Sequence, residues 1–196
     1  MKSKQTDELL YQALETEMGG VELYKAAIRC AQEEELKEEW QKYLEETERH
    51  VEILLNILET AGLDPQVMTP GRQLVRLQGQ SMLKLMAIAE AGDPEGAQLF
   101  AAECIVTAET KDHMNWSLLE IASKSFTGEL KTVVRAAIDE VEDQEDEHLY
   151  HTQGWTRELW IRSLGLKAVI PPPEEQKKVK TAIGAARAKA SRDSMR

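Results

Sequence analysis

The sequence predicts an all-α protein. Long stretches of the chain are rich in Glu, Ala, Leu, Lys and Gln, which are good helix formers. The six prolines and eleven glycines gather at a few points instead of being spread along the chain, and no segment has the alternating apolar and polar pattern of a strand. With 196 residues, 42% of them hydrophobic, the chain is long enough to bury a sizeable core in one domain.

Glycine and proline divide the chain into five long helices. Gly62 and Pro65 stop the second helix, Gly92 and Pro94 separate the third from the fourth, and Gly128 opens the last. A bend in the last helix is expected at Gly154. The expected helices cover residues 6–31, 36–61, 73–91, 94–124 and 128–164.

A proline run at 171–173 separates the helical body from a basic C-terminal segment. We therefore expect two parts, a helical domain over residues 1–165 and a tail over residues 166–196. The tail carries a net charge of +5; subtracting this from the total of −11 leaves −16 on the rest of the chain. Such an imbalance predicts that the tail docks on an acidic face of its own chain or of a neighbouring subunit, with a flexible, unbound tail as the alternative.

Composition also excludes several classes of partner. An acidic body repels nucleic acid and anionic membranes, and no stretch approaches the roughly 20 apolar residues of a spanning helix. Without a segment that resembles a signal peptide, a cytoplasmic location is expected. The two cysteines, Cys30 and Cys104, have no paired spacing and are expected to be buried free thiols.

Ionisable residues occupy the apolar stripe of the last helix. Glu145 and His148 lie between Val141 and Trp155 on one helical face. Burying two unpaired ionisable groups costs several kcal/mol each, so a positive charge should meet them there. A metal ion is the simplest candidate.

Three other helices place similar residues at the same depth. Chain reversals near 32–35 and 127–128 put Glu17 level with His50, and Glu109 level with Glu145. Carboxylate oxygens and imidazole nitrogens are ligands for iron and manganese, and bridging carboxylates hold two such ions close together. The candidate metal ligands are Glu17, Glu46, His50, Glu109, His113, Glu145 and His148.

This arrangement resembles the ferritin-like superfamily, which includes bacterioferritins and rubrerythrins. The matching features are Glu17 with Tyr24 seven residues later, Glu145-x-x-His148, and a long connection over residues 62–93. The resemblance covers about residues 7–164. It implies an antiparallel four-helix bundle with an extra helix in a long crossover. It also implies two irons per chain, with manganese as the other candidate metal, and a homodimer.

One position departs from the family pattern. Thr47 stands where the second helix of the family carries a glutamate, three residues before His50. The adjacent Glu46 is rotated by about 100° on an ideal helix. Either Glu46 or Glu48 substitutes, or the second metal position is weakened or lost, and a mononuclear site stays open.

The resemblance implies a non-haem dimetal protein of the oxidase, peroxidase or hydroxylase type. No rubredoxin-like cysteine pair is present, so a rubrerythrin-like peroxidase would need an external electron donor or partner protein. Two alternatives remain: iron storage or metal sensing without turnover, and a metal-free helical scaffold. The sequence leaves open whether the protein is an enzyme and what its substrate is. Met18, Met114, Trp116 and Trp155 are expected to lie buried near the site and to limit water access.

Overall fold

The computed structural model describes residues 3–195, with side chains for all of these except residues 94 and 95. Every regular element in this part is a helix, which confirms the all-α prediction. The long helices correspond to the five expected ones, and two short helices follow in the tail. The elements are α1 Lys4–Cys30, α2 Glu34–Thr60, α3 Pro70–Gly92, α4 Pro94–Ser123, α5 Gly128–Ser163, α6 Pro173–Gln176, α7 Ala182–Ser191 and a 3₁₀ turn, Arg192–Ser194.

Short polar side chains begin several helices. The Ser3 hydroxyl accepts a hydrogen bond from the Thr6 amide at 3.2 Å, so α1 starts before the expected position. Thr69 caps α3, and the Asp93 carboxylate caps α4 by accepting from the Gly96 amide at 3.0 Å. These caps set the ends between which the long helices run.

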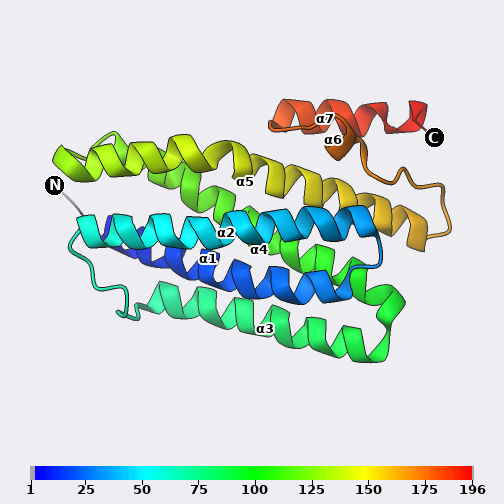
Figure 1. Cartoon of the computed structure of the whole chain (residues 1–196), viewed down its shortest axis with the longest axis horizontal. Coiled ribbons are helices and arrows are strands. Elements are labelled where there is room, and N and C mark those ends of the chain that lie inside the picture. The colour runs from blue at the N-terminus through cyan, green and yellow to red at the C-terminus, as the bar shows by residue number, and fades with distance from the viewer. Residues whose placement is uncertain (1–2, 196) are drawn as a thin grey trace.

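The long helices alternate in direction (Figure 1). Helices α1, α3 and α5 run one way, and α2 and α4 run the other way. Helix α1 packs against α2, α3 and α4, whereas α5 packs against α4 and α2. Because α3 carries the chain back along the length of the molecule, α4 begins at the end where α2 begins and runs parallel to it.

The apolar core is divided into two clusters. One contains Leu23, Trp40 and Trp155, and the other contains Leu14, Ile57 and Val141. On each of α1, α2, α4 and α5, the candidate metal ligands lie in sequence between residues of these two clusters. A buried polar layer therefore separates two apolar layers.

The basic tail folds back on α5 (Figure 1). Arg157 of α5 donates two hydrogen bonds to the buried Glu174 carboxylate, at 2.5 and 2.8 Å. Lys180 Nζ lies 3.5 Å from Asp143 Oδ2. The tail therefore docks on its own chain as predicted, but only the Lys180 contact joins a basic tail residue to an acidic face, since at Arg157 the charges are reversed.

Helix α5 runs unbroken through Gly154, where a bend was expected. This glycine instead leaves room for the tail, because an added Cβ would lie 2.7 Å from Glu174 Oε2 and 3.1 Å from Pro172 Cβ. The absence of a side chain at Gly154 allows the close contact between α5 and the tail.

No helix in the described part of the chain combines the length and the apolar character needed to cross a membrane. Cys30 and Cys104 are buried free thiols, as predicted. Burial raises the pKa of the Cys104 thiol to about 11, so this sulfur is uncharged at neutral pH.

Candidate metal centre

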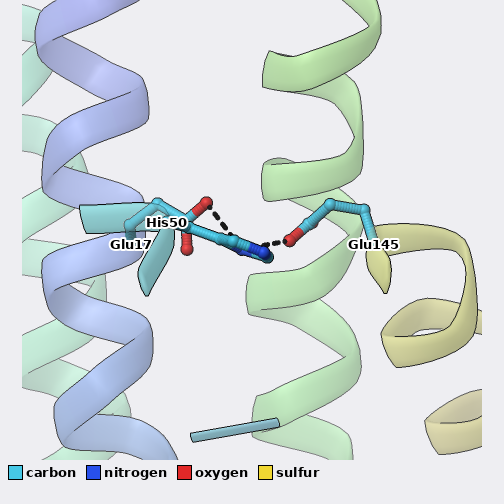
Figure 2. Close-up of side chains that lie close together, drawn as sticks. All are labelled: Glu17, His50 and Glu145. Atoms are coloured by element: carbon cyan, nitrogen blue, oxygen red, sulfur yellow. Dashed lines mark ion pairs between the residues drawn. The ribbon is translucent and has the colours of Figure 1, made fainter. Parts of the chain in front are cut away.

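The first group of ligand atoms comes from three helices. Glu17 of α1, His50 of α2 and Glu145 of α5 each place one ligand atom within 4.8 Å of the others. His50 Nδ1 lies 3.0 Å from Glu145 Oε1 and 3.4 Å from Glu17 Oε1. Figure 2 shows the imidazole ring pointing between the two carboxylates. One cation could contact all three residues.

The second group shares Glu145 with the first. It adds Glu109 of α4 and His148 of α5, again with ligand atoms within 4.8 Å of one another. His148 Nδ1 lies 3.7 Å from Glu109 Oε2 and 3.8 Å from Glu145 Oε1. Because Glu145 belongs to both groups, its carboxylate is placed to bridge two neighbouring cations.

The atoms that face inward are buried and form no hydrogen bond, although the two histidines lie within ion-pair distance of the carboxylates. None of the five residues is more than 4% exposed. Buried polar atoms without partners are rare in folded proteins and are costly in free energy. Cations between these atoms would remove that cost. The unpartnered atoms are Glu17 Oε2, His50 Nδ1, Glu109 Oε2, Glu145 Oε2 and His148 Nδ1.

The outer nitrogen of each histidine has a polar partner. His50 Nε2 lies 2.7 Å from Gln144 Oε1, and His148 Nε2 lies 2.9 Å from Glu46 Oε2. Both partners are acceptors, so each Nε2 carries a hydrogen and donates it outward. The Nδ1 lone pair can then face a metal ion, as it does in protein metal sites where an outer carboxylate orients the histidine.

The ion-free centre holds protons. Burial opposes the charged form of His50, but Glu17 and Glu145 raise its pKa to about 11. Burial likewise opposes charge on His148, whose pKa is raised to about 9 by Glu109 and Glu46. Burial and the Glu17 charge raise the pKa of Glu145 to about 7. A metal ion would displace these protons on binding.

Two aromatic side chains orient ligand carboxylates. Tyr24 donates a hydrogen bond from Oη to Glu109 Oε1 at 2.7 Å, and Trp116 donates from Nε1 to Glu17 Oε1 at 2.8 Å. Trp116 and Trp155 are buried as expected, but Met18 and Met114 are about half exposed because they lie on outer helix faces. These two methionines therefore do not limit water access.

Two predicted ligands lie outside both groups. Glu46 sits on the far side of His148, and His113 Nε2 lies 2.7 Å from Asp146 Oδ1 with its side chain 30% exposed. Helix α2 is regular, so nothing rotates Glu46 inward. Thr47 is buried against Gly20 of α1, where an added Cβ would lie 3.2 Å from its methyl carbon. The absence of a side chain at Gly20 thus leaves room for the Thr47 side chain between α1 and α2.

Asp112 is a buried carboxylate that the sequence reasoning missed. It is 4% exposed, and burial together with the charges of Glu17, Glu145 and Glu109 raises its pKa well above the ordinary range. It follows Glu109 by three residues, the same spacing that places Glu145 beside His148. This spacing is the feature of the sequence from which Asp112 could have been predicted.

A chain of charges links His148 to the tail. Glu46, which accepts from His148, has its Oε1 atom 3.7 Å from Lys42 Nζ. Lys42 in turn donates to Glu147 Oε1, and Glu147 Oε2 lies 3.8 Å from Lys180 Nζ. Alternating charges thus run from the interior to the C-terminal segment.

One cavity reaches the centre from outside. It has a volume of about 200 Å³, lies between α4 and α5, and includes Glu145, Trp116, His113 and Asp146 in its lining. A larger groove of about 770 Å³ between α1, α3 and α4 contacts none of the five grouped residues. Small molecules therefore have a route to the Glu145 side of the centre.

Comparisons with models of protein families, with curated proteins and with solved structures found no match. The function is therefore inferred from the geometry of the candidate metal centre.

Proposed function

We propose that this protein is a ferritin-like, dinuclear metal protein of the non-haem carboxylate class. The observation that carries the proposal is the pair of overlapping ligand groups, in which buried, unpartnered atoms from α1, α2, α4 and α5 surround a shared Glu145. The connectivity supports it too, because α3 occupies the long crossover that leaves α2 and α4 parallel.

The donor set supports iron or manganese. Three carboxylates and two imidazoles are oxygen and nitrogen donors of the kind that suit these ions. The residues present also fit the group, since the outer hydrogen bonds of His50 and His148 leave their inner nitrogens free to bind. Two such ions, when bound, supply electrons for the reduction of dioxygen or peroxide.

The chain's own residues fit an oxidase, peroxidase or hydroxylase. Tyr24 and Trp116 hold the Glu109 and Glu17 carboxylates in place. Apolar layers on both sides exclude bulk water, and the cavity beside Glu145 admits a small oxidant. Access to Glu145 favours turnover over a purely structural site.

Metal analysis tests the proposal directly. We expect the purified chain, loaded anaerobically with ferrous iron, to bind about two ions, and Glu145→Gln to lose both because it removes the shared carboxylate. Glu129→Gln, at an exposed position of the same helix, is the matched control and should bind like the unchanged chain. Binding of no iron or manganese by the folded, unchanged chain would contradict the proposal and favour a metal-free scaffold.

A further inference from the structure

Asp112 has no ordinary structural role. Its Oδ1 atom is buried and has no hydrogen-bond partner. Asp112 forms no ion pair with a lysine, arginine or histidine in the part of the chain that the structure describes. The adjacent Lys111 directs its ammonium group to Asn115 instead. A buried carboxylate without a cation is expensive to keep.

The carboxyl group of Asp112 faces other carboxylates. It is in hydrogen-bonding contact with Glu17, and it interacts electrostatically with Glu109 and Glu145. Two carboxylates in contact repel each other unless a proton or a cation lies between them. Asp112 therefore borders the same space as the two ligand groups.

Helix α2 supplies no carboxylate to either ligand group, because Glu46 contacts His148 from the outer side. Thr47, three residues before His50, is buried and its methyl carbon faces Gly20 of α1, so this position supplies no carboxylate. The two groups contain only three carboxylates, Glu17, Glu109 and Glu145. Their three negative charges do not balance two divalent cations.

We propose that Asp112 is a fourth carboxylate ligand of the dinuclear centre and binds the ion held by Glu17 and His50. This inference rests on the proposed metal-binding function. Asp112 restores the charge balance, with four carboxylates for two divalent cations and α4 supplying what α2 does not. Asp112 belongs to neither ion-free group, so its carboxylate would have to move toward the ion on binding.

The test is an anaerobic titration with cobalt(II), followed by calorimetry and by the visible absorption of bound cobalt. We expect Asp112→Asn to retain the ion at Glu109, Glu145 and His148 and to bind the other at least tenfold more weakly, with a changed spectrum for that ion. Asp139→Asn, at an exposed position, is the control and should match the unchanged chain.

A second readout separates ligation from structural support. Because Asp112 faces like charges, we expect the free energy of unfolding of Asp112→Asn in chelator to be no lower than that of the unchanged chain. Loss of a carboxylate with a structural role would lower it. Asp112→Ala serves the same titration if the amide variant does not fold. Two ions bound with unchanged affinity and spectrum in Asp112→Asn would overturn only this inference. An unchanged chain that binds no cobalt, iron or manganese would overturn the proposed function as well.

Discussion

Individual side chains at the candidate centre are arranged for a cation. His50 and His148 each present one nitrogen to carboxylates inside and the other to an acceptor outside. Glu145, the shared residue, has a pKa raised to about 7 by burial and by the charge of Glu17. In the ion-free chain, protons therefore offset the charge of the clustered carboxylates.

The ion-free chain should lose stability as pH rises. The folded-state pKa is raised to about 7 for Glu145, to about 9 for His148 and to about 11 for His50. The folded state thus binds more protons than the unfolded state, and stability decreases with pH where that holds. We expect the free energy of unfolding in chelator to fall by a few kcal/mol between pH 5 and 9.

Denaturant unfolding across this pH range measures the effect. Glu145→Gln removes one titrating group and weakens the shift of the histidines, so its profile should be shallower. A flat or rising profile for the unchanged chain would contradict the assigned proton occupancy.

At the scale of elements, small residues mark the close contacts. Gly20 lets α1 approach Thr47 of α2, and Gly154 lets the tail approach α5. The second contact is the tighter, because Glu174 is buried and held by two hydrogen bonds from Arg157. The contact with the tail, and not the conformation of α5, therefore explains the glycine at position 154.

Gly154→Ala should loosen the tail. Its Cβ would lie 2.7 Å from Glu174 Oε2, and overpacking of this kind costs about 1–3 kcal/mol. We expect a lower Tm and faster proteolysis of the segment after residue 165. Gly79→Ala on α3, where nothing lies within 4 Å of the added Cβ, is the control and should stabilise by about 0.5–1 kcal/mol. Equal effects of the two changes would contradict the close contact.

The sequence predicts the helices well because local residues determine where each helix ends. Gly62, Gly92 with Pro94, and Gly128 mark boundaries that need no tertiary information. The depth of Glu17 and His50 follows as well, since helical rise and a short reversal place both at one level.

Side-chain direction and helix spacing are harder to predict. Glu46 lies near the expected depth, yet it contacts His148 from outside because of how α2 faces α5. Thr47 reflects the narrow contact between α1 and α2, which no pattern on one helix reveals. Asp112 does not fit a pattern of Glu and His in apolar stripes, although its spacing of three residues from Glu109 places both on one face of α4.

At the scale of the whole molecule, the tail provides partners for polar side chains of α5. Arg157 pairs with Glu174, the Val169 amide donates to Glu158 at 2.8 Å, and His151 Nε2 lies 3.0 Å from the Val179 carbonyl oxygen. The tail therefore satisfies buried polar groups on the body, and the docked tail is part of the fold. The expected homodimer stays a prediction.

Truncation after Val169 should destabilise the body. Arg157 would keep Glu158 but lose Glu174. The buried side chains of Val179 and Ala188 would no longer cover the body, and the combined cost is about 3 kcal/mol. For a chain of this size, that corresponds to a Tm lower by roughly 6–12 °C, measurable by calorimetry. Arg187→Ala, an exposed change in the same segment, should leave Tm unchanged. An unaltered Tm after truncation would show that the docked tail contributes nothing.

The charges that run from His148 through Glu46, Lys42 and Glu147 to Lys180 form a line of contacts through which the interior and the C-terminal segment could be coupled. Equilibrium coupling between two sites is reciprocal. If detachment of the segment changes the affinity for an ion by some factor, occupation by that ion changes the detachment equilibrium by the same factor.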